Sequence, residues 1–256
     1  MNVLLLLAGV LLILMVAVGG MNGVRSFISL FLNGIILLVT VFFMLDTQTN
    51  ILLLTLVACA ALCAVNLFYI NGLNRKTLAA FIATFLTLGV LLSVIYLVTD
   101  VAMIQGFSEE ETEELDAYNL LIGIDYVQVA AAVIIMSTIG AIMDVAMSIT
   151  SSMHEYARHT TSTPRQLVAH GMLIGRDILG TDTNTLFFAF FGGYLGLLIW
   201  FKDLHYSFGE IVNAKVFGAE VLTIFTAGIG IALVIPMAAW TSVLVSKLFA
   251  KGNRAA

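Results

Sequence analysis

Charged residues, prolines and cysteines are all scarce in this sequence. Only 11% of its 256 residues are charged, two are proline and two are cysteine. Soluble domains carry about one quarter charged residues, so this chain has too few to cover the surface of a water-soluble enzyme. Two cysteines cannot build a secreted disulfide scaffold, and the formal charge of −5 disfavours nucleic-acid binding. Hydrophobic residues instead make up 61% of the chain, with a mean hydropathy of +1.06, which predicts an integral membrane protein.

Seven apolar runs are each long enough, or nearly so, to cross the roughly 30 Å core of a bilayer. They lie at about residues 2–18, 27–45, 51–70, 78–98, 119–147, 184–201 and 217–245. The first run is the shortest. No basic residue precedes it and no convincing cleavage site follows it, so we interpret it as a span rather than a secretory signal. The sequence therefore predicts an all-α, polytopic bundle of about seven transmembrane helices.

The polar separators suggest how the chain is organised. They define an N-terminal four-helix membrane segment, an acidic extracytoplasmic loop and a membrane core, at residues 1–105, 106–118 and 119–256. Within the core, Thr163, Pro164 and Gln166 form a helix-start pattern, with a capping box and proline in the first turn. Apolar residues then recur at helical spacing. This pattern predicts an amphipathic helix at about 164–180, lying on the cytoplasmic surface.

Basic residues divide unevenly between the two sides that seven spans define. One side holds only Lys202 and Lys215, and the other holds Arg25, Arg75, Lys76, Arg158, Arg165, Arg176, Lys247, Lys251 and Arg254. The positive-inside rule then predicts an N-terminus outside and a C-terminus in the cytoplasm. The acidic loop falls outside, where Ser108 and Glu111 predict a capping box. We interpret this loop as a solvated charged segment, with a cation-attracting vestibule or a docking patch as the alternative.

One polar stripe follows the fifth apolar run. Asp144 is succeeded by Ser148, Ser151, Ser152 and Glu155, a spacing that places all five on one side of a helix. Ionisable groups within membrane spans are costly and usually functional. Asp144 is therefore a candidate functional residue, although a carboxylate hydrated by lipid headgroups would explain the same pattern.

The most polar cluster in the chain directly precedes the sixth run, at residues 175–185. It contains Arg176, Asp177, Thr181, Asp182, Thr183, Asn184 and Thr185. Such groups in or near lipid must satisfy one another or line a wet cavity. We predict a proton or ion relay formed by Asp144, Arg176, Asp177 and Asp182. A structural network that locks the helices together is the alternative.

We also assign secondary roles to several other polar residues and to two glycines. Ser148, Ser151, Thr181, Thr183, Asn184 and Glu220 are expected to support the relay. Gly192 and Gly196 form a GxxxG pair suited to close helix packing. Asn66 and Asn71 are expected to form hydrogen bonds between helices or at the membrane interface. Glu220 could equally be a solvated residue near the outer surface.

The sequence offers little support for an enzyme. His154, Glu155 and His159 resemble a zincin motif, but the two histidines are five residues apart and so cannot share one zinc on one helix face. An intramembrane aspartate protease needs two facing carboxylates deep in the bilayer, and only Asp144 approaches that depth. We therefore expect no catalytic residue, no metal and no cofactor.

Two long motifs carry a family resemblance. GAIMDVAMSITSS at 140–152 and HGMLIGRDILGTDTNTLFFAFFGG at 170–193, together with the helix of Glu220, resemble the YibE/F-like family of bacterial membrane proteins. The motifs cover about 119–248, and the earlier spans fit by hydropathy alone. Without an extracytoplasmic domain, the chain is similar to the short YibF-type member. That resemblance implies a bacterial plasma membrane location and a YibE-type companion protein.

A weaker resemblance concerns the membrane halves of SecD/SecF and resistance-nodulation-division permeases, in which intramembrane carboxylates conduct protons. This analogy is at the level of the fold, and the chain has no large periplasmic domain. The leading hypothesis is a subunit of a transport or translocation-type permease, proton-coupled through the relay. The alternative is a non-transporting scaffold that holds the companion protein, and a homo-oligomer is a further assembly to test.

Overall fold

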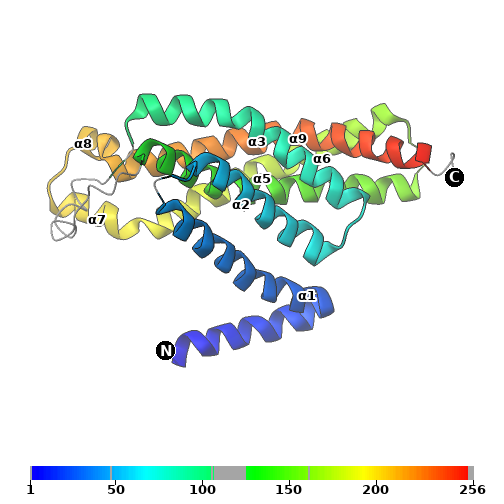
Figure 1. Ribbon diagram of the computed structural model, residues 1–256, viewed down its shortest axis with the longest axis horizontal. Helices are drawn as coiled ribbons and strands as arrows, with labels where there is room; N and C mark the ends of the chain where they lie inside the picture. Colours follow the sequence, from blue (N-terminus) through cyan, green and yellow to red (C-terminus); the bar gives the residue numbers. More distant parts are fainter. Residues whose placement is uncertain (1, 47, 105, 107–124, 161, 253–256) are drawn as a thin grey trace.

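The computed structural model describes residues 2–46, 48–104, 106, 125–160 and 162–252 (Figure 1). Every regular element in these ranges is helical, which confirms the all-α prediction for them. The elements are α1 (Asn2–Met44), α2 (Ile51–Cys63), the π-helical η1 (Ala64–Tyr69), α3 (Arg75–Ala102), α5 (Tyr126–His159), α6 (Pro164–Gly193), α7 (Leu195–Asp203), α8 (Phe208–Asn213) and α9 (Lys215–Gly252). Apart from Gly106, the acidic loop with Ser108 and Glu111 lies outside the described residues.

Five helical segments are long and apolar enough to cross a membrane: α1, α2 with η1, α3, α5 and α9. A sixth is obtained if α6 and α7 form one span, bent by 51°. The seven predicted spans are not confirmed, because the first two are joined in α1. This helix bends sharply at Gly20, where φ is 55°, and Figure 1 shows it as two arms. Gly23 permits the bend, since a Cβ there would clash with the carbonyl of Met15.

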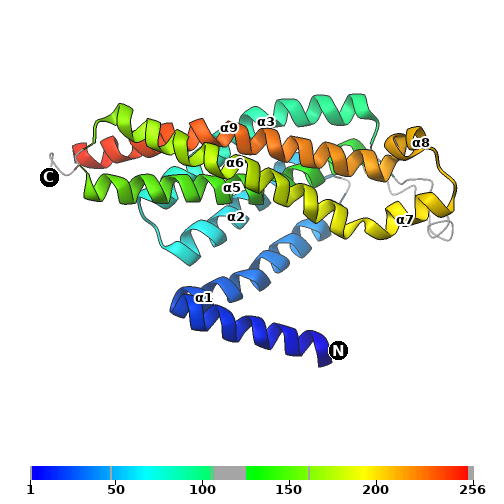
Figure 2. The same ribbon diagram turned by 180° about the vertical axis from the view of Figure 1, so that it is seen from behind.

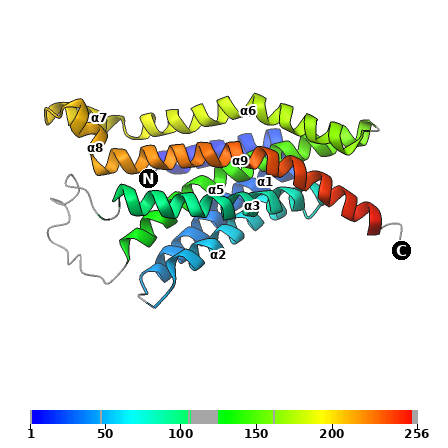
Figure 3. The ribbon, with the colours of Figure 1, turned by 90° about the horizontal axis from the view of Figure 1, so that it is seen from above.

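The centre of the bundle is formed by α3, α5 and α9, with α2 packed on α5 and α6 packed along α9 (Figures 2 and 3). Leu91, Ile142 and Ile231, one from each central helix, are fully buried. Gly230 lies at the same level, and a Cβ there would be 2.7 Å from Cδ1 of Ile142. The absence of a side chain at this position allows α9 to approach α5 closely.

The expected amphipathic surface helix is the first half of a longer helix. The predicted capping box of Thr163 and Gln166 is present, with proline in the first turn. However, α6 does not end near residue 180 and continues to Gly193. Its apolar stripe, which includes Leu167 and Gly171, is buried against the bundle. This burial explains the difference, because the same periodicity that suits a membrane surface also suits a helix packed on neighbouring helices.

Basic residues meet at the end of the bundle where α5 turns into α6. The ammonium of Lys76, at the start of α3, donates to the hydroxyl of Ser151 at 3.3 Å. The guanidinium of Arg75 lies over the ring of Phe249, 5.2 Å from its centroid. Lys202 and Lys215 belong to α7 and α9 at the opposite end (Figure 2). Which end faces the cytoplasm stays a prediction.

Asn66 is confirmed as a helix–helix hydrogen bonder. Its amide and that of Asn33 in α1 exchange two hydrogen bonds, of 3.0 and 3.3 Å. We expect Asn33→Leu to lower the free energy of unfolding by about 1 kcal/mol, the usual size of such intramembrane contacts. Denaturation in mixed micelles measures it, with Asn22→Leu as the control on the exposed face of α1. Equal effects of the two variants would contradict the prediction.

Candidate functional site

Asp144 lies about midway along α5, 18 residues after Tyr126 and 15 residues before His159. At 1.5 Å per residue, about 22 Å or more of helix extends on either side of it. Asp144 and Ser148 are exposed, and Ser151 and Ser152 are half-buried. Glu155 belongs to a local cluster at the helix end, where it pairs with His159 at 2.8 Å and Arg158 at 3.6 Å. The predicted stripe therefore exists, and its first part lies near the middle of α5, on an exposed face of the helix.

The polar part of α6 is carried to the level of Asp144 by the antiparallel packing of α5 and α6. Tyr156 of α5 stacks on His170 of α6, with ring centroids 4.2 Å apart. One residue further along α6, a Cβ at Gly171 would lie 2.5 Å from Sδ of Met153. This close approach fixes the register of the two helices. Residues further along α6 consequently lie beside residues progressively earlier in α5.

A second glycine fits α6 against α9. A Cβ at Gly175 would clash with Cγ2 of Ile235. Two turns later, Cγ2 of Thr183 lies 3.6 Å from the position that a Cβ on Gly228 of α9 would occupy. Gly171 and Gly175 are four residues apart, so both fall on the buried stripe of α6. They form the small-residue pair that positions the polar cluster.

Asp182 is the residue that this packing brings to Asp144. The two carboxylates, from α6 and α5, are close enough for their charges to interact. Asp144 also interacts electrostatically with the buried thiol of Cys63 in α2. Asp182 is half-buried, whereas Asp144 has an exposed side chain. The charges of two of the four predicted relay residues therefore interact, and the relay itself stays a prediction.

Arg176 and Asp177 do not join this pair. Both are exposed on the turns of α6 that precede Asp182. Among the described residues, the only ion pairs are those of Glu155 with Arg158 and His159. Arg176 instead borders a shallow hollow with Tyr156 and His170. No Asp144–Arg176 ion pair is formed within the described part of the chain.

Some of the predicted supporting side chains form hydrogen bonds within the bundle, and others are exposed. Thr183 donates to the carbonyl of Leu179 at 2.7 Å, so its proton is used within α6. Ser151 accepts from Lys76, a contact that the sequence did not indicate. Thr181 and Asn184 are exposed and, with Ser148 and Asp144, extend the polar face over α5 and α6.

Three other predicted residues lie away from the carboxylate pair. Gly192 and Gly196 fall on different helices, α6 and α7, and a Cβ at either would have nothing within 4 Å. They thus make no close helix contact within the described chain. Glu220 is near the start of α9, where its Oε1 accepts a hydrogen bond of 2.7 Å from the hydroxyl of Tyr194.

No cluster of three or more His, Cys, Asp or Glu side chains arranged to hold a metal ion occurs in the ranges that the structure covers. The Asp144–Asp182 pair offers two carboxyl groups alone, which suits a proton or a weakly held cation better than a tightly bound metal.

This fold and site define a polytopic α-helical membrane protein with polar groups gathered midway along two antiparallel helices. The YibE/F-like protein family model matches residues 7–248, and the chain belongs to that family. The match includes the early spans, which the sequence motifs had linked to the family by hydropathy alone. No curated protein and no solved structure matches the chain.

Proposed function

We propose that this chain is a subunit of a transport or translocation-type permease in which the Asp144–Asp182 pair binds a proton or a cation. The interaction between the charges of these two carboxylates, one from α5 and one from α6, carries the proposal. Two neighbouring carboxyl groups repel each other when both are ionised, and a bound proton or cation relieves that repulsion. Binding and release at this pair can therefore be coupled to a change in helix packing.

The exposed polar face supplies a route to the pair. The turns of α6 between the α5–α6 turn and Asp182 carry Arg176, Asp177 and Thr181, which are all exposed. A charged side chain facing lipid at the bilayer centre costs about 2.5–3.5 kcal/mol on insertion scales. These groups are therefore expected to face water or another protein in the assembled membrane, and a water-filled path would lead a proton from the cytoplasmic end to Asp182.

Proton movement in liposomes tests this proposal. We expect the chain, purified with any stoichiometric companion and reconstituted with a pH-sensitive dye inside, to acidify the lumen when a membrane potential is imposed. Asp144→Asn should lower the initial rate at least about tenfold, because an amide cannot carry the proton. The matched control is Asp203→Asn, at the exposed end of α7.

A cation would give the same charge movement without acidification, and exchanging the external salt separates the two cases. Full activity of Asp144→Asn would refute the coupling role of the pair. A folded protein without any flux, even with its companion present, would favour the second candidate.

That second candidate is a non-transporting scaffold that holds a YibE-type companion in the membrane. The observation that favours it is the exposure of Asp144, Ser148, Thr181 and Asn184 on one face. Helices of a partner could cover this face with hydrogen-bonding groups. In that case Asp144→Asn would reduce the amount of companion recovered in mild detergent and leave any flux unchanged.

A further inference from the structure

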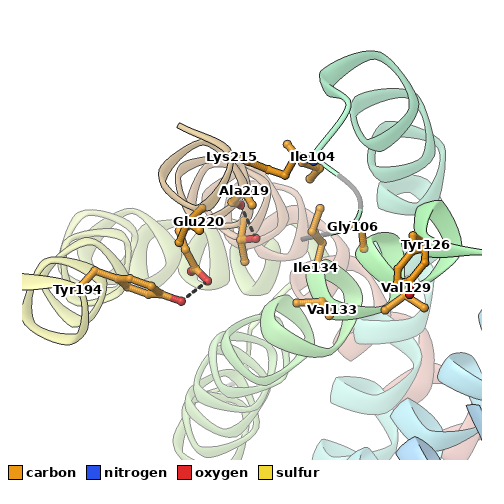
Figure 4. A pocket seen from close by; sticks show the side chains of 13 residues that line it. Ile104, Gly106, Tyr126, Val129, Val133, Ile134, Tyr194, Lys215, Ala219 and Glu220 are labelled. Atoms are coloured by element: carbon orange, nitrogen blue, oxygen red, sulfur yellow. Dashed lines mark hydrogen bonds between the residues drawn. The ribbon is translucent and has the colours of Figure 1, made fainter. Parts of the chain in front are cut away.

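A separate cavity lies at the end of the bundle opposite the α5–α6 turn. It has a volume of about 350 Å³ and is formed by the beginnings of α5 and α9, the residues after α3, and Tyr194 at the end of α6 (Figure 4). Its walls are mostly apolar, with Ile104, Val129, Val133 and Val216 among them. This volume falls in the range of pockets that bind small ligands.

Polar groups of both charges line the same space. Glu220 and Lys215 come from the first turns of α9, and Tyr126 comes from the first turn of α5. Figure 4 shows Tyr194 reaching toward Glu220 from one side, while Tyr126 lies on the far side of the cavity. The Tyr194 hydroxyl donates a hydrogen bond to Oε1 of Glu220. Within the described residues, Oε2 accepts no hydrogen bond, so it is available to a donor in the cavity.

Residues near the ends of candidate membrane spans border the cavity, so we expect it to lie near the level of the lipid headgroups. Lys215 begins α9, and Glu220 follows five residues later, or about 7.5 Å along the helix. Tyrosines gather at the interface between lipid and water, and two of them, Tyr126 and Tyr194, border this cavity. A ligand here would have its polar part beside Glu220 and its apolar part against the valines of α5.

We infer that this cavity binds the headgroup of a phospholipid that carries a primary ammonium, such as phosphatidylethanolamine. The ammonium donates to Oε2 of Glu220, and the phosphate lies toward the ammonium of Lys215. The first methylenes of the acyl chains pack on Val129 and Val133. A trimethylammonium headgroup has no N–H to donate, so the site discriminates by hydrogen bonding as well as by charge. This inference is independent of the proposed transport activity.

Native mass spectrometry of the delipidated full chain, titrated with defined lipids, tests the inference. We expect phosphatidylethanolamine to bind about tenfold more tightly than phosphatidylcholine, from one charge-assisted hydrogen bond. Glu220→Gln should abolish that preference, and Asp203→Asn should retain it. Val133→Phe fills the cavity without changing a charge, and we expect it to weaken the binding of both lipids while the protein stays folded.

A soluble ligand could offer the same ammonium and phosphate. Glycerophosphoethanolamine, the headgroup without acyl chains, distinguishes the two sources. If it binds as tightly as the lipid does, the site belongs to a soluble molecule and the lipid assignment is overturned. Equal binding of the two phospholipids by the unmodified protein, or an unchanged preference in Glu220→Gln, overturns it as well.

Discussion

Gly175→Leu is expected to detach α6 from the bundle and to lower the free energy of unfolding by about 3 kcal/mol, the upper part of the range for overpacked sites. Even a Cβ at this position would clash with Cγ2 of Ile235 in α9, so a larger side chain cannot be accommodated without moving a helix. Thermal unfolding of the detergent-solubilised protein, followed by circular dichroism, measures the loss. The Asp144–Asp182 contact should be lost with it, because α6 positions Asp182.

Gly192→Leu is the matched control for this substitution. The residue lies on the same helix, but a Cβ there would have nothing within 4 Å. We expect a change within about 0.5 kcal/mol, as for other substitutions away from packed sites. A larger loss for Gly192→Leu than for Gly175→Leu would mean that α6 packs through its other end.

Charge reversal at the carboxylate pair should show strong coupling between α5 and α6. Asp144→Lys and Asp182→Lys each create an attractive pair of opposite charges, whereas the double variant places two ammonium groups together. We therefore expect the double variant to be less stable than the sum of the single effects by about 2 kcal/mol, within the range for residues in contact. The four proteins are compared by their unfolding free energies in one micelle composition.

A second double-mutant cycle, with Asp177→Lys and Asp144→Lys, is the control for the first. Asp177 is on the same helix as Asp182, but among the described carboxylates only the charge of Asp182 acts on Asp144. This second cycle should be additive within about 0.5 kcal/mol. Similar coupling in both cycles would show that the effect reflects general charge in the membrane and not the Asp144–Asp182 contact.

The helical class and the starts of α2 and α6 could be predicted from the sequence because apolar runs and turn signals are local features. The capping box of Thr163 and Gln166 was found in this way. The continuation of α6 through residue 180 was not, because amphipathic periodicity does not tell whether the apolar stripe faces lipid or protein. The number of spans also could not be predicted, because it depends on how the two arms of α1 lie in the membrane, which local sequence features do not determine.

The sequence singled out the residues of the candidate site but not which of them lie near one another. Asp144 and Asp182 were identified by the cost of placing carboxylates in lipid, and their contact arises from the register of α5 and α6. One signal for that register was present in the sequence. Gly171 and Gly175 form a GxxxG pair, but close helix packing was predicted for Gly192 and Gly196 instead.

The continuity of α6 also has a consequence for how the protein is made. Only together with α7 does α6 form a candidate membrane span. Arg176, Asp177 and Asp182 would each oppose its transfer from the translocon into lipid. The surface that buries its apolar stripe is provided mainly by α9, which is synthesised afterwards. Stable insertion of α6 must therefore await the emergence of α9 from the ribosome, and the last helix made completes the placement of the polar groups before it.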